Sequence, residues 1–350
     1  MPKTDVSLLR RKFRGSMLGV LTGDCLGSPY ENDDILTSGE KIMLQKSLDK
    51  LEGPSYKAPV MQFTDDSAMT RSVAQSLVQK RCLDICDMAK KFVKSYYQEP
   101  QRGYGPGVVT VFRKLRGNKF SDVLGPAKEQ FQGRGSFGNG GAMRITPIAL
   151  FCHREYNNLL EMARQQSEIT HTHQLGVDGA ILQAIAIQQS LLLNPEDELD
   201  IVKFVDELIE KMNFIESDEE GLDLVEAQPY KAQLGVLKKF LTEEDQGPHA
   251  EKIVHELGND VIAIRSVPTA IYCFLRAQKP IEGIQTGNPW RRTIQYAISL
   301  GGDTDTIASM AGALAGAYYG ETKISPALLE HCEASAEFRD LGDKLYEIST

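Results

Sequence analysis

Two stretches of small residues at four-residue spacing constrain the fold of this chain more than any other feature. Each stretch lies within a helical pattern, one near each end of the chain. The small residues are Gly15, Gly19, Gly23 and Gly27 in the first and Ala308, Gly312, Gly316 and Gly320 in the second. Each glycine costs a helix roughly 1 kcal/mol, so four on one stripe suggest a helix backbone packed closely against a neighbour. We predict that these two helices pack face to face at the centre of the fold. The alternative is that the glycines relieve crowding against different neighbours.

The rest of the chain shows helical periodicity and no convincing alternating strand pattern. We expect one all-α domain over residues 1–350, with its core between about residues 8 and 346. The expected helices cover 6–21, 41–51, a segment that begins at 64 or 65, 84–97, 108–115, 143–152, 157–168, 175–193, 199–212, 230–241, 261–277, 289–300, 304–319 and 336–348.

Composition excludes several classes of protein. With 39 basic and 48 acidic residues the net charge is −9, which disfavours a broad nucleic-acid surface, so no direct nucleic-acid partner is expected. The six cysteines are dispersed and fit reduced thiols in an intracellular protein. No apolar run approaches the ~18 residues of a membrane span. The N-terminus has arginines without a secretory core, which leaves a mitochondrial leader open.

Two acidic motifs each open a predicted helix. They are Thr64-Asp65-Asp66 and Asp303-Thr304-Asp305-Thr306. Each motif taken alone is explained by helix capping. Together they place four carboxylates and three threonine hydroxyls where buried helices begin. Buried carboxylates repel one another unless cations or protons intervene. Oxygen ligands favour Mg²⁺, Mn²⁺ or Ca²⁺ over zinc, and the number of carboxylates allows two ions.

A glycine-rich segment, GRGSFGNGGAMR, spans residues 133–144. Its spacing matches a dinucleotide-binding fingerprint, but that fingerprint requires a preceding strand and a βαβ unit, which are missing. We therefore expect a loop whose backbone amides and Ser136 face an anion, with Phe131 or Phe137 free to stack on a base. The alternative is a flexible surface loop.

Three further polar residues deserve separate interpretations. His171, in Thr-His-Thr-His, is expected to contact a ligand or the backbone at a helix entry, with a purely structural role as the alternative. Glu31 follows the glycine helix and could gate a metal cluster, although a surface glutamate is the simpler explanation. Asp24 lies toward a helix C-terminus, which is unfavourable unless a neighbouring donor pairs with it.

Taken together and in this order, four motifs closely resemble the ADP-ribosylglycohydrolase (ADP-ribosyl-acceptor hydrolase) family. They are GDCLGSPYE, QFTDDSAMT, GRGSFGNGGAMR and SLGGDTDTIASMAGALAGAYYG. The second and third are most similar to the ADP-ribosylserine hydrolase member. The resemblance covers nearly the whole chain and implies an orthogonal helix bundle with two Mg²⁺ ions in a central cleft.

The resemblance also implies roles for individual residues. The implied metal ligands are Thr64, Asp65, Asp66, Asp303, Asp305, Thr306 and the flap residue Glu31. Glu31 and Asp303 are the implied catalytic candidates for moving the proton. The implied substrate-binding residues are Phe131, Arg134, Gly135, Ser136, Phe137, Gly138, Asn139, Gly140, His171, Val261 and Asp65. Phe137 departs from the tyrosine familiar in the family, and the loss of that hydroxyl should spare stacking.

The resemblance implies hydrolysis of ADP-ribose O-linked to serine, with cleavage of poly(ADP-ribose) and O-acetyl-ADP-ribose as secondary activities. ADP-ribosylated proteins and poly(ADP-ribose) are the expected partners, in DNA damage and DNA repair. A monomer without membrane contact is expected, in the nucleus and cytoplasm and, with the leader open, the mitochondrial matrix. The alternatives are an ADP-ribosylarginine hydrolase, a two-metal phosphohydrolase that attacks the diphosphate, and an inactive ADP-ribose reader.

Overall fold

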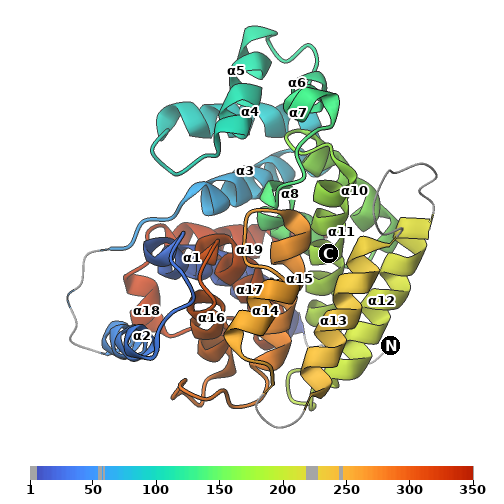
Figure 1. Cartoon of the computed structure of the whole chain (residues 1–350). Coiled ribbons are helices and arrows are strands. Elements are labelled where there is room, and N and C mark those ends of the chain that lie inside the picture. The colour runs from blue at the N-terminus through green and yellow to red at the C-terminus, as the bar shows by residue number, and fades with distance from the viewer. Residues whose placement is uncertain (1–5, 54–56, 58–59, 218–227, 244–246, 350) are drawn as a thin grey trace.

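The chain folds into an all-α bundle in the computed structural model (Figure 1). The structure describes residues 6–53, 57, 60–217, 228–243 and 247–349. Within these ranges the only extended pairings are two isolated bridges, Met61 with Cys332 and Gly138 with Ile262. The predicted all-α class is therefore confirmed.

The helices are bounded as follows, in chain order. They are α1 (Val6–Gly27), η1 (Ser28–Tyr30), α2 (Ser38–Leu51), α3 (Asp65–Lys80), α4 (Ile85–Gln98), α5 (Pro106–Gly117), α6 (Gly125–Lys128), α7 (Gln130–Gly133), α8 (Gly140–Met143), α9 (Thr146–Phe151), α10 (Tyr156–Glu168), α11 (Gln174–Leu192), α12 (Ile201–Ser217), α13 (Pro229–Thr242), α14 (Ala250–Glu256), α15 (Ala263–Arg276), α16 (Pro289–Ser299), α17 (Thr304–Tyr319), η2 (Glu321–Lys323), α18 (Pro326–Glu330) and α19 (Ser335–Ser349).

Helices α1 and α17 pack antiparallel through their small residues, as the sequence predicts. A Cβ atom placed on Gly19 would lie 2.1 Å from the carbonyl oxygen of Gly312. A Cβ on Gly23 would lie 2.2 Å from the Ala308 carbonyl oxygen. Both distances are far below van der Waals contact, so only glycine permits this approach of two backbones.

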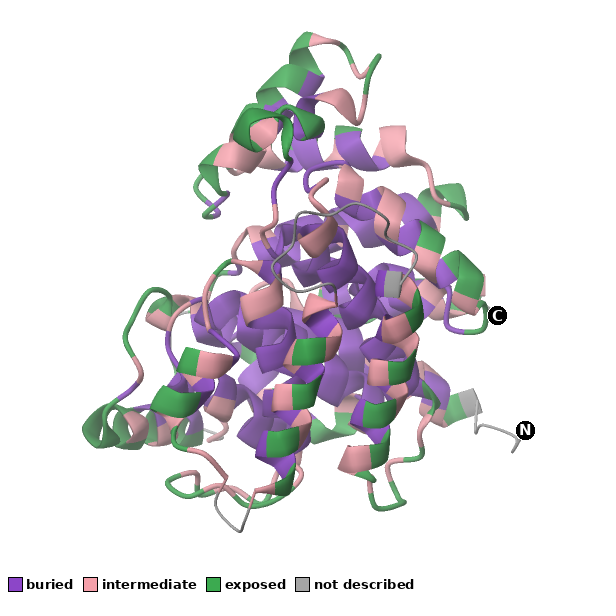
Figure 2. Cartoon of the chain, turned by 45° about the vertical axis from the view of Figure 1, so that its right-hand side comes forward, coloured by how far each residue is buried: buried purple, intermediate pink, exposed green. Residues whose placement is uncertain are grey.

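Helix α11 lies in the interior of the bundle, where it packs against α10, α15 and α17. Figure 2 shows that buried residues gather at the centre of the bundle, and nearly all residues of α11 and α17 are buried. We expected no segment long and apolar enough to span a membrane. This expectation is wrong, because α11 has the length and the composition of such a segment. However, 89% of its apolar window is buried inside the molecule, which is the usual environment of a core helix.

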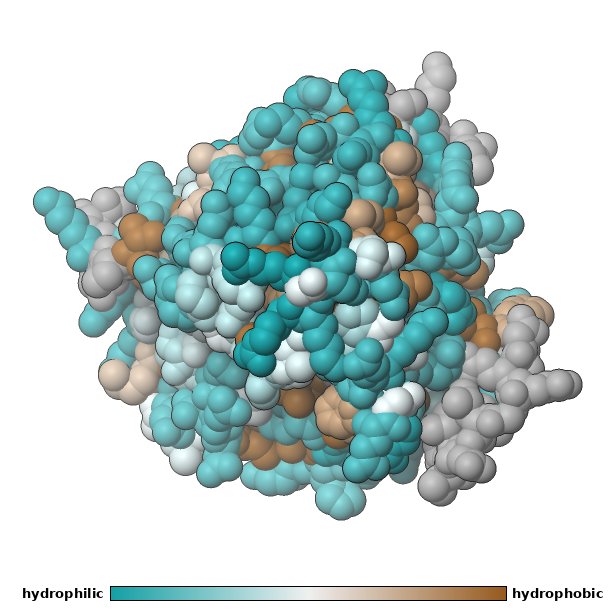
Figure 3. All heavy atoms as spheres, turned by 90° about the horizontal axis from the view of Figure 1, so that it is seen from above, coloured by the Kyte–Doolittle hydropathy of each residue, from teal (hydrophilic) through white to brown (hydrophobic). Residues whose placement is uncertain are grey.

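Helices α4, α5, α6 and α7 form one end of the molecule, at the top of Figure 1, and α4 packs on α3. Viewed from that end, the surface is mostly hydrophilic with small apolar spots (Figure 3). Phe131 and Gln132 in α7 have φ values of 51° and 61°, a left-handed conformation that is uncommon for residues other than glycine. This turn leads directly into the glycine-rich segment 133–144, which we call the glycine loop.

Several predicted helix boundaries are wrong. The helix expected over 6–21 continues to Gly27, and the helix expected over 199–212 continues to Ser217. The helix expected over 143–152 is two short helices, α8 and α9, because Pro147 lies in the first turn of α9 and cannot donate a hydrogen bond to the preceding turn. The helix expected from Val261 begins at Ala263, since the preceding residues pair with the glycine loop. The short helices α6, α7, α14 and α18 were not expected.

The packing of α1 on α17 predicts that Gly19→Ala destabilises the protein by about 3 kcal/mol, because the added methyl group meets backbone that cannot rotate away. Gly235→Ala is the matched control, since nothing lies within 4 Å of a Cβ at this exposed position within α13. The control should gain about 1 kcal/mol from helix propensity. Urea-unfolding midpoints measure both changes. A Gly19→Ala variant as stable as the unmodified protein contradicts the close packing.

Candidate metal centre and ligand loop

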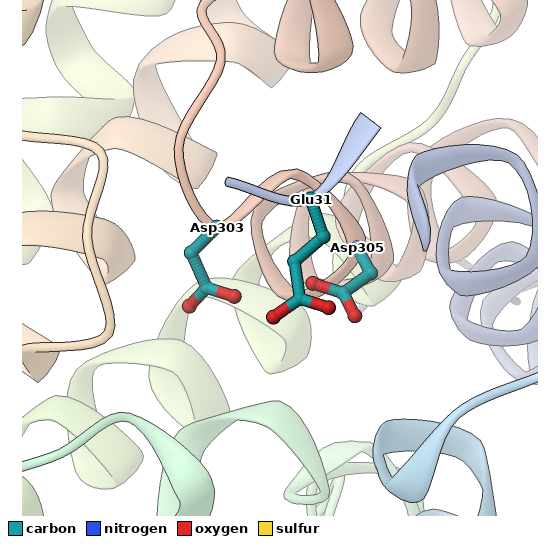
Figure 4. A group of neighbouring side chains, drawn as sticks. All are labelled: Glu31, Asp303 and Asp305. Carbon is teal, nitrogen blue, oxygen red and sulfur yellow. The ribbon is translucent and has the colours of Figure 1, made fainter. Parts of the chain in front are cut away.

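Three carboxylates meet at the start of α17. Glu31, Asp303 and Asp305 each place one oxygen so that all three oxygens lie within 4.8 Å of one another. Figure 4 shows Glu31 between the two aspartates, with the three carboxylate groups directed the same way. Asp303 and Asp305 are buried, whereas Glu31 is exposed. We call these three residues the acidic triad.

The contact between α1 and α17 brings Glu31 to this position. At its end, a Cβ on Gly27 would lie 2.5 Å from the Thr304 carbonyl oxygen, and the Thr304 hydroxyl donates to the Gly27 carbonyl at 2.9 Å. The chain then turns through η1. Beyond Glu31, the Asn32 amide donates to the Gly302 carbonyl at 2.8 Å. The loop that carries Glu31 is therefore attached at both ends to the start of α17.

The turn before α17 requires glycine. Gly301 and Gly302 have φ values of 69° and 75°, and a Cβ on Gly302 would lie 2.1 Å from the Asn259 carbonyl oxygen. That carbonyl also accepts a hydrogen bond from the Asp303 amide at 2.7 Å. The segment that contains Asn259 thus fixes the backbone of the first aspartate.

The second acidic motif opens α3, with Thr64 as its N-cap. The Thr64 hydroxyl accepts from the Asp66 amide at 3.3 Å. The Asp66 Oδ1 atom is buried and has no hydrogen-bond partner, which leaves an acceptor available for a cation. Asp65 and Asp66 lie outside the 4.8 Å group of the acidic triad.

Asp24 supports this motif from α1. Its carboxylate accepts from the backbone amides of Thr64 and Ser67 at 3.0 Å each. The predicted conflict of Asp24 with the dipole of its own helix is offset, because the carboxylate faces the positive N-terminus of α3. The Asp65 amide donates to the Arg102 carbonyl at 2.7 Å. The first turn of α3 is therefore fixed by two other segments.

The two acidic motifs belong to one electrostatic cluster. Burial raises the pKa of Asp66 well above its usual range, and the charge of Asp305 raises it further. Burial also raises the pKa of Asp305 to about 10, with Asp303 adding to the shift. The pKa of Glu31 is raised by partial burial and by Asp303. Such a cluster is stable only with bound protons or cations.

The residues present fit a hard divalent cation. Every donor is an oxygen, most are buried, and one buried carboxylate oxygen lacks a partner. The Thr306 amide donates to Asp305 Oδ1 at 2.8 Å and orients that carboxylate. The acidic triad and the α3 motif with Thr64 and Thr306 are the groups that could hold metal.

The glycine loop is attached to the acidic triad. The Asn139 Nδ2 atom donates to Asp303 Oδ2 at 2.5 Å and to the Ser266 hydroxyl at 3.0 Å. The Asn139 amide donates to the Val261 carbonyl at 2.9 Å, and the Ala263 amide donates to the Phe137 carbonyl at 3.1 Å. The loop therefore pairs with the segment before α15 and contacts a predicted metal ligand directly.

Within the loop, the backbone conformation at position 135 requires glycine. Its φ is 75°, and a Cβ there would lie 2.2 Å from the Thr172 hydroxyl. Ser136 is buried, and its hydroxyl accepts from the Gly138 amide at 3.3 Å. Arg134 is exposed and donates to the Phe131 carbonyl at 3.4 Å.

The predicted aromatic residues lie side by side. The Phe131 and Phe137 rings are 5.3 Å apart and tilted by 38°. Phe131 is 49% exposed and Val261 is 60% exposed, which makes them two of the few large apolar side chains that face solvent in the described part of the chain. Exposed apolar surface beside a polar loop fits contact with a flat ligand.

His171 lies under the loop. It is buried, and a Cβ on Gly140 would lie 2.4 Å from its Cε1 atom. The residues missed by the sequence analysis are Asn259, which holds Asp303, and Arg144 with Thr170, which contact His171 through a hydrogen-bond network. A Gly-Asn-Asp turn before a predicted helix was the available signal for Asn259. Nothing in the sequence pattern relates Arg144 to His171.

Removal of metal should destabilise the protein in a pH-dependent way. The folded carboxyls have raised pKa values, including about 8 for Asp65, so metal-free folded protein holds protons that the unfolded chain releases above about pH 4. Its unfolding free energy therefore falls as the pH rises from about 4 to about 8. Added Mg²⁺ should raise the melting temperature by more at pH 8 than at pH 5.5. Scanning fluorimetry after EDTA treatment measures this difference.

Asp305→Asn should lose most of the Mg²⁺ effect, while Asp206→Asn should keep it, because Asp206 pairs with Lys238 on the surface. An equal Mg²⁺ gain at both pH values, or in both variants, contradicts the assignment of cations to this cluster.

Asp24→Asn should weaken Mg²⁺ binding about tenfold and cost about 1–3 kcal/mol. The side-chain amide lacks the negative charge that faces the N-terminus of α3, and in either orientation it places an NH₂ group where the Thr64 amide now meets a carboxylate oxygen at 3.0 Å. The control is Asp84→Asn, since Asp84 caps α4 by accepting from the Asp87 amide at 2.9 Å and asparagine is an equally good cap. Titration calorimetry measures the affinity. Unchanged Mg²⁺ affinity in Asp24→Asn would show that α3 needs no support from α1.

Comparison with known proteins identifies relatives along the whole chain. The chain is 42% identical over 348 residues to a Gallus gallus protein named ADP-ribosylhydrolase ARH3, covering 96% of this chain and 93% of the relative. The Homo sapiens protein of the same name is 41% identical over 345 residues, with the same shares covered.

A solved structure described as an ADP-ribosylglycohydrolase-related protein complex shares the fold, with a TM-score of 0.67 and 21% identity over 98% of this chain and 100% of its own. The sequence profile described as ADP-ribosylglycohydrolase matches residues 5–350. With that match and the identity to the two relatives, this chain belongs to the ADP-ribosylglycohydrolase family of glycosidase-type hydrolases.

Proposed function

We propose that this chain hydrolyses ADP-ribose O-linked to serine in modified proteins and that it uses two Mg²⁺ ions. The observation that carries the proposal is the 2.5 Å hydrogen bond from Asn139 Nδ2 to Asp303 Oδ2. This contact joins the glycine loop to the acidic triad, which supports a ligand that reaches from one to the other. The relatives named ADP-ribosylhydrolase support the class of substrate. Preference for serine rests on the similarity of the segments GRGSFGNGGAMR and QFTDDSAMT.

In this proposal, one set of residues binds the metal ions and another binds the substrate. The metal ligands are Glu31, Thr64, Asp65, Asp66, Asp303, Asp305 and Thr306. The backbone amides of the loop and the Ser136 hydroxyl bind the diphosphate, since turning amides form a nest for anions. Phe131, Phe137 and Val261 contact the adenosine end.

Mg²⁺ held by these ligands would supply positive charge near the ribose hydroxyls and the attacking water. The bond between the anomeric carbon and the serine oxygen breaks through an oxocarbenium-like state. Water adds to that carbon and loses one proton, and the departing serine oxygen takes up one proton. Asn139 holds Asp303 as an acceptor, while Glu31 is the exposed carboxylate of the triad. We therefore assign the proton transfer to Glu31, whose pKa is already raised by burial and by Asp303.

The net charge of −9 opposes a polyanionic substrate. The exposed Arg134 at the loop and the bound cations would offset that charge locally. We include poly(ADP-ribose) and O-acetyl-ADP-ribose as further substrates and ADP-ribosylated proteins of the DNA-damage response as partners. We expect a monomer that acts in the nucleus, the cytoplasm and the mitochondrial matrix.

The proposal is tested with two synthetic peptides, one ADP-ribosylated on serine and one on arginine, each with Mg²⁺ or with EDTA. Release of free ADP-ribose from the serine peptide, with Mg²⁺ only, is the expected result. Release from the arginine peptide alone would assign the other amino-acid linkage. AMP as the product would identify a phosphohydrolase, and binding without turnover would identify a reader.

Asp303→Asn should lower the rate on the serine peptide by about 10³-fold, because it removes a carboxylate shared by the cation site and the loop. Asp206→Asn, remote from the site, should retain the full rate. Mass spectrometry of the released ADP-ribose measures both. Full activity of Asp303→Asn would exclude the proposed site.

A further inference from the structure

A buried arginine is the donor in three hydrogen bonds beneath the glycine loop. Arg144 is fully buried. Its Nε donates to Gln166 Oε1 at 2.8 Å, and its Nη2 donates to the Gln166 carbonyl at 2.7 Å. Its Nη1 donates to the Thr170 hydroxyl at 2.7 Å. A guanidinium has five N–H donors and no acceptor, so the direction of each of these hydrogen bonds is fixed.

The Thr170 hydroxyl passes this direction to His171. Its oxygen accepts from Arg144, and the oxygen lies 2.7 Å from His171 Nδ1. Thr170 is fully buried, and in the described part of the chain Nδ1 is the one acceptor that its proton can reach. If Nδ1 carried hydrogen instead, the threonine proton would be buried without a partner, which native structures avoid.

His171 Nδ1 is therefore an acceptor, and the single ring proton is on Nε2. Burial and the charge of Arg144 lower the pKa of His171 to about 3, so the ring stays neutral near pH 7. Nε2 faces the loop, since it lies 3.4 Å from a Cβ placed on Gly138 and 2.8 Å from one placed on Gly140. No acceptor among the described residues hydrogen bonds to Nε2.

We propose that Arg144 and Thr170 are positioning residues that fix His171 in the Nε2–H tautomer, so that it donates a hydrogen bond to a diphosphate oxygen held by the glycine loop. Phosphate oxygens only accept, and the opposite tautomer would direct a lone pair at them. The identity of the ligand rests on the proposed function, whereas the tautomer is a property of the protein alone.

The tautomer is tested first, by ¹⁵N-edited NMR of the histidine side chains in ligand-free protein. His171→Gln, which removes its signal, provides the assignment. The unmodified protein and Thr170→Ser should show His171 protonated on Nε2. Thr170→Val, which is isosteric but lacks the hydroxyl, should show Nδ1–H or a mixture. His171 protonated on Nδ1 in the unmodified protein, or unchanged on Nε2 in Thr170→Val, would overturn the proposal.

The consequence for binding is tested with ADP-ribose by calorimetry. Thr170→Val should bind about tenfold more weakly, the loss expected for one hydrogen bond to a charged acceptor, while Thr170→Ser should stay within about twofold. With the serine peptide, KM should rise and kcat should change little. Equal affinity of all three proteins would overturn the ligand assignment.

A second pair of variants guards against misfolding of Thr170→Val. Glutamine can present an N–H donor near the position of Nε2, and the shorter asparagine cannot. His171→Gln should therefore bind ADP-ribose more tightly than His171→Asn, and equal binding contradicts a donor at Nε2. If serine peptides are not cleaved but ADP-ribose binding follows these orders, the proposed reaction fails and this inference stands.

Discussion

The close approach of α1 and α17 is the constraint on which the site depends. Their backbones meet where Gly19 faces Gly312 and Gly23 faces Ala308, with no space for a Cβ. Since the helices run antiparallel, the end of α1 must meet the start of α17. Glu31 therefore reaches Asp303 and Asp305, although more than 270 residues separate them in the chain. These glycines lower the helix propensity of both segments, but only they allow the contact that brings the three carboxylates together.

Buried carboxylates also need support from neutral and positive groups. The two helices that the acidic motifs open supply part of this support, because the N-termini of α3 and α17 carry partial positive charge. Asp24 adds a further link, since it belongs to α1 and accepts from the first turn of α3. One helix thus contacts both acidic motifs, through glycine on one side and through a carboxylate on the other. A divalent cation would complete the charge balance that burial leaves unfavourable.

Much of this arrangement could be predicted from the sequence, because it depends on local patterns. The glycine spacing predicted the contact of α1 with α17, and the boundaries predicted for α17 are those observed. The proline at position 147 signals a helix break, but the apolar residues around it favoured the single helix that we expected over 143–152. The hydrogen bond from Asn139 to Asp303 joins residues 164 positions apart, and no periodicity encodes such a pair. The same is true of Arg144 and His171, whose relation depends on the packing of α8 beside α10.

We propose that the motifs at α3 and α17 form one two-ion site. The most direct test is a crystal structure of the protein soaked with Mn²⁺, in which anomalous scattering locates each ion and its ligands. We expect two ions, with Asp65 or Asp66 and Asp303 or Asp305 among their ligands. Ions bound by α17 alone, or no ion between the two motifs at saturating Mn²⁺, would contradict it.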